Sequence, residues 1–283
     1  LWFAEGFTSY YTNLIRARSG NITAEQYVNG VGGSVSYVMN APGRKFFNPI
    51  EMSYRAPFVD AASAIDPDNN ANIFISYYTY GSVLGLALDM SLRTMDKGLN
   101  LDGYMAYVWK THGSPEIPYS VRDLQARLGE YAGEAFATEF FEKHIFNSEM
   151  PDYVSLFKQM GVVFENPSPN SPTLGAFVSF RNGLGEMRQN TLIGSPFYQA
   201  GIEREDKIVS INGTSMADFK GRNVDELVSD RKPGDKVQVI IDRWGKQMTK
   251  TVTLAANQNM RSAWDANASA AAVKRRTDWL MGK

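Results

Sequence analysis

The stretch GSPFYQAGIEREDKIVSINGTSM, residues 194–216, determines the fold class of the second half of this chain. Pro196 fits the opening turn of a short helix, and Gly201 can adopt the left-handed conformation that ends one. An apolar strand follows, and Asn212-Gly213 is a dipeptide typical of tight turns. The pattern predicts a short helix, a strand and a turn in close succession.

Short strands are predicted on both sides of this stretch. The linker ENPSPNSPT, residues 165–173, has three prolines among small polar residues and little to bury. After it, short apolar and β-branched runs indicate strands, and one short helix, NVDELVSD at 223–230, interrupts them. The predicted strands are LGAFVSF (174–180), MRQNTLI (187–193), DKIVSING (206–213), KVQVIIDRWG (236–245) and KQMTKTVTL (246–254).

This order of features resembles the core of bacterial PDZ domains from about Thr173 to Leu254. In PDZ domains an apolar-Gly loop caps the carboxylate of a bound peptide, which pairs with the adjacent strand edge. The resemblance implies a groove for a C-terminal peptide, and the alternative is that the matching positions are plain core. Those positions are the loop residues Leu174, Gly175 and Ala176 and the helix residues Val224, Leu227 and Val228. Ala176 departs from the large apolar residue that is usual there.

Helix signals dominate the first half of the chain, from Leu1 to about Phe164. Thr23 and Gln26 have capping-box spacing, and Ser120 and Gly133 suit the two ends of a helix. The run YYTYGSVLGLALDMSLR, residues 77–93, predicts an amphipathic helix. The Pro- and Gly-punctuated segment APGRKFFNPIEMSYRAPFVD, residues 41–60, predicts loops with some strand.

The opening LWFAEGFTSYY, residues 1–11, places an acid among aromatic residues that read as a buried helix. An acid in such surroundings is costly to bury unless it is paired. The partner of Glu5 could be an arginine such as Arg16 or Arg44, or it could be a metal ion.

The same opening resembles the segment that follows the H-E-x-x-H helix of gluzincin metallopeptidases, where a Glu before Gly is the third zinc ligand. Glu5 is the matching residue. The run at 77–93 resembles the aminopeptidase stretch in which a Tyr precedes the Gly of a long apolar helix, and aligning on Gly81 selects Tyr78. A hydroxyl there could stabilise the oxyanion of a tetrahedral intermediate. Tyr77 and Tyr80 are close rivals.

Together with the PDZ-like region, these motifs identify the chain as similar to the glycyl aminopeptidase family. Those proteins are zinc metallopeptidases in which a thermolysin-like catalytic domain precedes a PDZ domain. This chain departs from them in having no H-E-x-x-H and only two histidines, His112 and His144. The resemblance therefore places the zinc-binding histidines and the general-base Glu upstream of Leu1. The fragment alone is expected to bind zinc weakly and to be inactive.

Composition excludes several other classes. The net charge of the 283 residues is −1, which gives no electrostatic case for nucleic acid or an anionic membrane. No apolar run is long enough to span a bilayer. Cysteine is absent, so there are no disulfides and no cysteine-based zinc sites. We expect a periplasmic or secreted protein in preference to a cytoplasmic one.

The sequence thus predicts an α+β protein: the mainly helical C-terminal half of a thermolysin-like catalytic domain, followed by a small β-rich PDZ domain. The expected divisions are 1–164 (catalytic part), 165–172 (linker), 173–256 (PDZ domain) and 257–283 (C-terminal helix). The predicted function is that of a zinc-dependent aminopeptidase acting on peptide substrates. The alternative is a non-catalytic peptide-binding PDZ protein with a helical scaffold.

Overall fold

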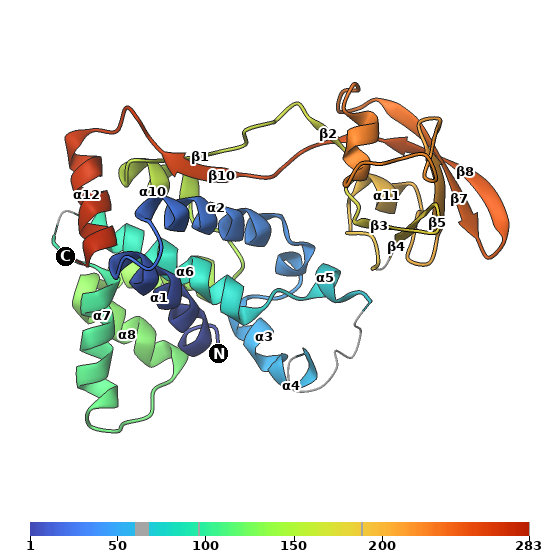
Figure 1. The fold of residues 1–283 in the computed structure, drawn as a ribbon. Helices are drawn as coiled ribbons and strands as arrows, with labels where there is room; N and C mark the ends of the chain where they lie inside the picture. The colour runs from blue at the N-terminus through green and yellow to red at the C-terminus, as the bar shows by residue number, and fades with distance from the viewer. Residues whose placement is uncertain (60–67, 96, 188, 283) are drawn as a thin grey trace. The chain divides into compact units, whose positions relative to one another are not determined.

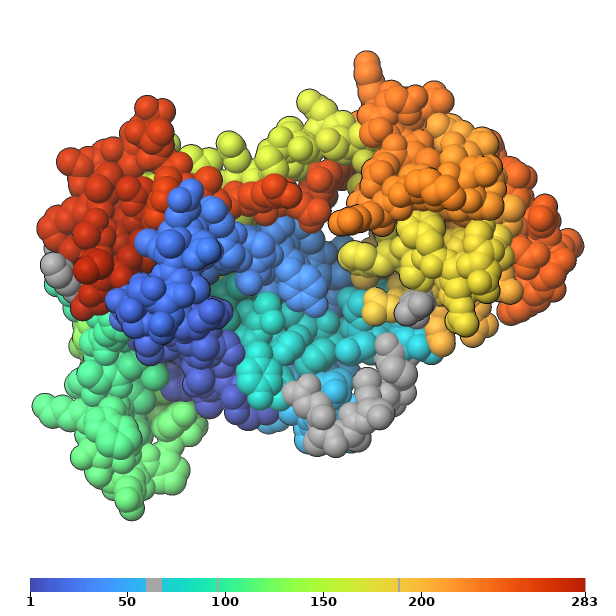
Figure 2. Space-filling model, viewed as in Figure 1, coloured from blue at the N-terminus to red at the C-terminus, as the bar shows by residue number. Residues whose placement is uncertain are grey.

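The computed structural model describes residues 1–59, 68–95, 97–187 and 189–282. The chain forms two compact units, which we call the helical unit and the β-rich unit (Figure 1). The helical unit contains 1–57, 75–165 and 260–283, and the β-rich unit contains 58–74 and 166–259. The β-rich unit is thus inserted into the chain of the helical unit, because the C-terminal segment returns to the helical unit. Figure 2 shows the same view as a space-filling model.

The helical unit is built around α6, which packs against α1, α2, α3, α7 and α10 (Figure 1). Its helices are α1 (Ala4–Arg18), α2 (Ala24–Asn40), η1 (Pro42–Lys45), α3 (Pro49–Tyr54), α6 (Tyr77–Arg93), α7 (Leu101–Val108), η2 (Trp109–Gly113), α8 (Val121–Ala132), α9 (Glu134–Phe140), η3 (Phe141–Ile145), α10 (Tyr153–Gln159) and α12 (Ala270–Met281), with α4 (Ala56–Val59) at the boundary of the two units.

The predicted helix ends are confirmed by the capping contacts. The Thr23 hydroxyl accepts a hydrogen bond from the Gln26 amide, and the Gln26 side chain accepts one from the Thr23 amide. Ser120 caps α8 in the same reciprocal way with Asp123, and Gly133 ends that helix with φ of 116°. These side chains satisfy backbone groups that a helix end leaves unpaired, which fixes where each helix begins.

The helices α1 and α6 touch through their backbones near their N-terminal ends. A Cβ atom on Gly6 would lie 2.4 Å from the Cα of Gly81, and a Cβ atom on Gly81 would lie 1.9 Å from the carbonyl oxygen of Trp2. Only glycine fits both positions at this separation. The Gly after Glu5 is therefore needed by the helix crossing itself, quite apart from any chemistry.

The C-terminal segment closes the helical unit. Strand β10 (Arg261–Trp264) pairs antiparallel with β1 (Val162–Glu165), and α12 then packs against α1 and α10. The indole N–H of Trp279 donates to the hydroxyl of Tyr10 at 2.9 Å, and Arg18 donates to the Trp279 carbonyl. Trp279 is fully buried.

The β-rich unit is an antiparallel sheet in the order β3-β4-β5-β7-β8, with β6 paired to β5. Its hydrophobic core includes Phe197, Ile208, Val239 and Val252. Its elements are α5 (Asn70–Ile73), β2 (Pro172–Thr173), β3 (Val178–Arg181), β4 (Leu184–Met187), α11 (Pro196–Gln199), β5 (Lys207–Ile211), β6 (Thr214–Ser215), η4 (Val224–Val228), β7 (Lys236–Arg243), β8 (Lys246–Thr253) and β9 (Ala255–Ala256).

A segment from the first half of the sequence also belongs to the β-rich unit. The side chain of Asn72, 2% exposed, donates to the carbonyl of Thr191 at 3.0 Å and accepts from the amide of Ile193 at 2.8 Å. Asp68 forms an ion pair with Arg204. Division of the chain by sequence position alone did not foresee this segment.

Two local predictions differ from the structure. The segment 41–60 was predicted as loops with some strand, but its described part forms the helices η1, α3 and α4; Asp60 lies outside the described residues. Asn48 explains part of this, because it caps α3 in a reciprocal box with Glu51. The strand predicted at 187–193 is also wrong: β4 ends at Met187, position 188 lies outside the described residues, and 189–193 is irregular. A turn at Asn182-Gly183 connects β3 to β4, and these two strands pair antiparallel.

Candidate functional site

Glu5 and Tyr78 lie in the first turns of α1 and α6, at the crossing of these two helices. Glu5 directly precedes Gly6, and Tyr78 lies three residues before Gly81. The carbonyl oxygen of Tyr77 would be 3.0 Å from a Cβ on Gly6. The backbone contact of the two glycines therefore brings these first turns together. Sequence motifs that lie far apart along the chain become neighbours in space.

The carboxylate of Glu5 is half-buried, and the described part of the chain gives it no hydrogen bond or ion pair. Arg44 is not its partner, because the Arg44 guanidinium donates to the carbonyls of Ser148 and Met39. Arg16 follows Glu5 on the same helix by eleven residues, which is about 16 Å along the axis. The structure thus does not form the arginine pair that the sequence offered as the ordinary explanation for this acid.

The three tyrosines at the start of α6 differ in exposure. Tyr77 is 3% exposed and Tyr80 is fully buried, whereas Tyr78 is 41% exposed. Burial raises the pKa of Tyr80 to about 12. The rings of Tyr77 and Tyr78 pack together with centroids 4.9 Å apart. Of these three hydroxyls, that of Tyr78 is the one a substrate could reach without moving the core.

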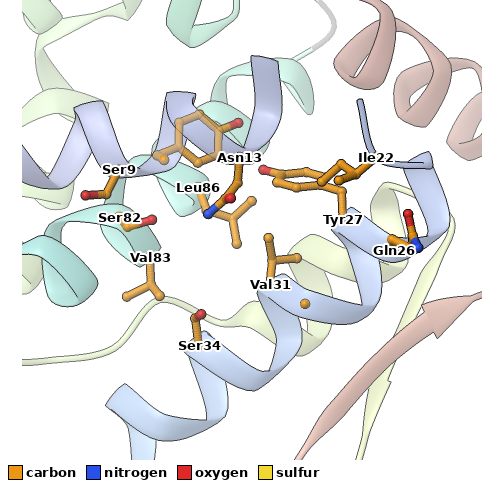
Figure 3. A pocket seen from close by; sticks show the side chains of 12 residues that line it. Ser9, Asn13, Ile22, Gln26, Tyr27, Val31, Ser34, Ser82, Val83 and Leu86 are labelled. Carbon is orange, nitrogen blue, oxygen red and sulfur yellow. The ribbon is translucent and has the colours of Figure 1, made fainter. Parts of the chain in front are cut away.

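A cavity of about 180 Å³ lies between α1, α2 and α6, close to this crossing (Figure 3). Ser9 and Ser82 line it, and Figure 3 shows them at one end with Gln26 at the other. Ser9 is four residues after Glu5, and Ser82 is four residues after Tyr78, so each serine shares a helix face with its candidate residue. The cavity therefore continues the surface that carries Glu5 and Tyr78. Asn13 and Ser34 also line it, together with tyrosine and apolar side chains.

The described residues do not make a complete metal site. Within them, no three His, Cys, Asp or Glu side chains are grouped so that they could hold a metal ion. His112 lies in η2, where its Nδ1 is 3.3 Å from the Ile117 carbonyl, and Nδ1 of His144 is 2.6 Å from the Glu149 carbonyl. Each histidine thus has a local backbone partner. Glu5 can supply one zinc ligand, fewer than the usual three or four.

The loop at 173–176 in the β-rich unit has an unexpected partner. Asp225, in η4, accepts a hydrogen bond from the amide of Leu174 at 2.7 Å and another from the hydroxyl of Thr173 at 2.7 Å. The hydroxyl oxygen of Thr173 in turn accepts from the amide of Gly175 at 2.9 Å. Gly175 has φ of +65°, and a Cβ there would lie 2.9 Å from Pro196 Cδ.

The predicted groove residues are mostly inside the domain. Leu174 and Val228 are fully buried and Val224 is 2% exposed, so all three are core residues in this structure. Leu227 and Ala176 are partly buried and pack against the same core. Their role in ligand binding stays a prediction. Sequence reasoning missed Asp225, because an acid in the first turn of a helix is an ordinary capping feature.

Glu5, Gly6 and Gly81, the residues of the helix crossing, all lie in a stretch that matches a known protein family. Residues 1–84 match the M61 glycyl aminopeptidase family. We call residues 1–84 the M61 segment. It contains both Glu5 and Tyr78, and the match confirms the resemblance predicted from the sequence.

A solved structure has the same fold over nearly all of the chain. It is the crystal structure of an aminopeptidase N family protein from Idiomarina loihiensis, with a TM-score of 0.82 and 23% identity over 99% of this chain and 48% of that one. The fold of this chain is thus found within a longer chain, of which it spans about half.

Two curated proteins share shorter stretches with this chain. The serine protease Do-like HtrA of Bacillus subtilis (strain 168) is 37% identical over 91 residues, which is 32% of this chain and 20% of HtrA. A protein of Lactococcus lactis described as a zinc metalloprotease is 35% identical over 79 residues, 28% of this chain and 17% of that protein. The chain thus spans about a fifth of the length of these curated relatives.

The predicted α+β fold class is confirmed: a helical part is joined to a small antiparallel β region. None of the helices in the described ranges is both long and apolar enough to cross a membrane.

Proposed function

We propose that this chain is the C-terminal part of a zinc-dependent aminopeptidase that hydrolyses N-terminal residues from peptides. The observation that carries the proposal is the crossing in the M61 segment, where Glu5 and Tyr78 lie on adjacent first turns close to a cavity with both polar and apolar lining. The relative described as a zinc metalloprotease and the fold shared with an aminopeptidase N family protein support it.

In this proposal each residue has a separate role. Glu5 would be the one zinc ligand that this chain supplies, since its carboxylate is not taken up by an arginine: Arg44 donates to the carbonyls of Ser148 and Met39. Zinc in such enzymes acts as a Lewis acid and activates water. The Tyr78 hydroxyl would donate a hydrogen bond to the oxyanion of the tetrahedral intermediate. The remaining ligands and the general base would come from an H-E-x-x-H helix that precedes residue 1.

Replacing Glu5 by Gln tests the ligand role in the longer protein that carries such a helix. Gln keeps the shape and removes the anionic ligand, so we expect a large loss of bound zinc and of activity. Glu25→Gln is the matched control, because Glu25 is an exposed acid in the first turn of the neighbouring helix α2. Metal analysis that finds undiminished zinc in the Glu5 variant would show that the assignment is wrong.

Replacing Tyr78 by Phe tests the oxyanion role. The side chain is 41% exposed, so loss of its hydroxyl should change stability little. We expect kcat to fall by roughly 10²–10³ while KM barely moves. Tyr77→Phe and Tyr80→Phe are controls with buried rings. If kcat falls in a control variant and not in Tyr78→Phe, the alignment on Gly81 that selects Tyr78 is wrong. If all three variants keep the wild-type kcat, the oxyanion donor lies elsewhere.

For the β-rich unit we propose peptide binding by strand addition at β3. Within the described residues β3 pairs only with β4, so its other edge is open to an extended chain. Phe177, directly before β3, is 80% exposed, and Phe180, within β3, is 39% exposed. The same feature supports the second candidate function, a non-catalytic peptide-binding protein. The coding sequence before residue 1 distinguishes the two, because H-E-x-x-H there supports the enzyme.

A further inference from the structure

The loop that would receive a peptide's carboxylate already holds a carboxylate of the same domain. The two oxygens of Asp225 accept hydrogen bonds from the Leu174 amide and the Thr173 hydroxyl, both at 2.7 Å. Through Thr173 the same acid orients the hydroxyl oxygen toward the Gly175 amide at 2.9 Å. Backbone amides arranged in this way are the donors that capture a C-terminal carboxylate in peptide-binding domains.

Asp225 is held in place by its own element. Its amide donates to the Asn223 side chain at 3.0 Å, and Asn223 forms a reciprocal capping box with Glu226. On either side, Val224 and Val228 anchor η4 in the hydrophobic core. Moving the acid away from the loop would therefore disturb a capped and buried turn. Asp225 is therefore fixed by the packing of the domain.

The stretch of sequence that contains the loop supplies no positive charge to offset a second carboxylate. The sequence from Gln159 to Phe180, which includes the loop, contains no lysine or arginine. A ligand carboxylate at the Leu174 amide would lie next to the fixed negative charge of Asp225 and would lose the donors that Asp225 occupies. Like charges brought together at an interface are strongly unfavourable, and such repulsion is a common source of specificity.

We propose that Asp225 stands in for a ligand's C-terminal carboxylate, so that the groove rejects peptides with a free C-terminus. The groove then accepts extended segments whose C-terminus is blocked or whose chain continues past the loop. This inference rests on strand addition at β3, the function proposed above for the β-rich unit. It makes Asp225 the specificity-determining residue of the groove.

The test uses the 283-residue chain and two small probes, N-acetyl-valine and N-acetyl-valine amide. Amide resonances of Leu174 and Gly175 report binding. We expect neither probe to shift them in the wild type at millimolar concentration, and we expect the acid alone to shift them in Asp225→Ala. The gain in affinity for the acid should be at least about tenfold, which is 1.4 kcal/mol. Asp230→Ala is the matched control, since Asp230 is an exposed acid of the same segment that makes no contact with the loop.

Asp225→Asn covers the case in which the alanine variant does not fold. Its amide oxygen can still accept from Leu174, and the charge is gone, so it should also gain affinity for the acid. A saturable shift of the wild-type resonances by N-acetyl-valine overturns the inference. So does a folded Asp225 variant that responds to the acid no more than the wild type does.

A longer probe separates this inference from the function on which it rests. The hexapeptide acetyl-Thr-Val-Thr-Val-Thr-Val is titrated as the amide and as the free acid, and resonances of β3 are followed. Strand addition predicts that the wild type binds the amide, and the inference predicts that it binds the acid at least about tenfold less tightly. If no form binds any variant, strand addition is wrong, while the N-acetyl-valine titration still decides the role of Asp225.

Discussion

The crossing of α1 and α6 predicts that Gly81→Ala destabilises the helical unit. A methyl group at this position would lie 1.9 Å from the Trp2 carbonyl oxygen and 2.8 Å from the Gly6 Cα. The shorter contact is about 1.5 Å inside van der Waals separation. Both neighbours are backbone atoms and cannot rotate away, so the helices themselves must move apart.

The magnitude follows from two opposing terms. Overpacking of this kind costs about 1–3 kcal/mol and occasionally more, whereas alanine in place of glycine favours a helix by about 1 kcal/mol. Because the overlap is with backbone, we expect a net loss of about 2 kcal/mol in the free energy of unfolding. Moving α1 would also separate Phe7 from Gly85, against which its ring packs.

The matched control is Gly33→Ala in α2. A Cβ at Gly33 meets nothing within 4 Å, and the position is exposed. This variant should therefore gain up to about 1 kcal/mol from helix propensity alone. Urea unfolding followed by helical circular dichroism measures both variants. The reasoning is refuted if Gly81→Ala is as stable as the wild type, or if the two substitutions change stability in the same direction.

Three further predictions concern the helical unit. Calorimetry with residues 1–283 should show no stoichiometric sub-micromolar zinc binding, because zinc needs three or four ligands and the described residues group no such set around Glu5. Tight binding would contradict this. Burial lowers the pKa of His144 below its ordinary 6.5, so between the two values the unfolded chain binds more protons and stability rises with pH. Stability should thus fall as the pH drops through 6.5, and a His144→Gln variant with the same slope would disprove the cause. Asp89→Ala should cost about 3–5 kcal/mol in thermal unfolding, because it removes the buried ion pair with Arg93 at 3.0 Å and also the acceptor of the Tyr10 hydroxyl and the Leu101 amide. A loss below about 1 kcal/mol would contradict this role of Asp89.

Features that depend on neighbouring residues could be predicted from the sequence alone. The helix starts at Thr23 and Ser120, the stop at Gly133, and the strand and turn at 206–213 were found because a helix end or a turn is satisfied within a few residues. The identity of Glu5 and Tyr78 as candidates also came from local motifs. The segment 41–60 was misread because Pro occurs in the first turn of helices as well as in loops.

Features that depend on distant residues were decided by the tertiary structure. In the motif Glu5-Gly6, the glutamate is a candidate site residue and the glycine can serve a close helix crossing. Only the contact of Gly6 with Gly81 in the structure shows that the glycine has this second role. The sequence does not distinguish Tyr78 from Tyr77 and Tyr80, but in the structure Tyr78 is exposed and the other two are buried. The contact of Asp225 with the loop joins positions 51 residues apart. Such pairings follow from how whole elements pack against one another, and local spacing does not record them.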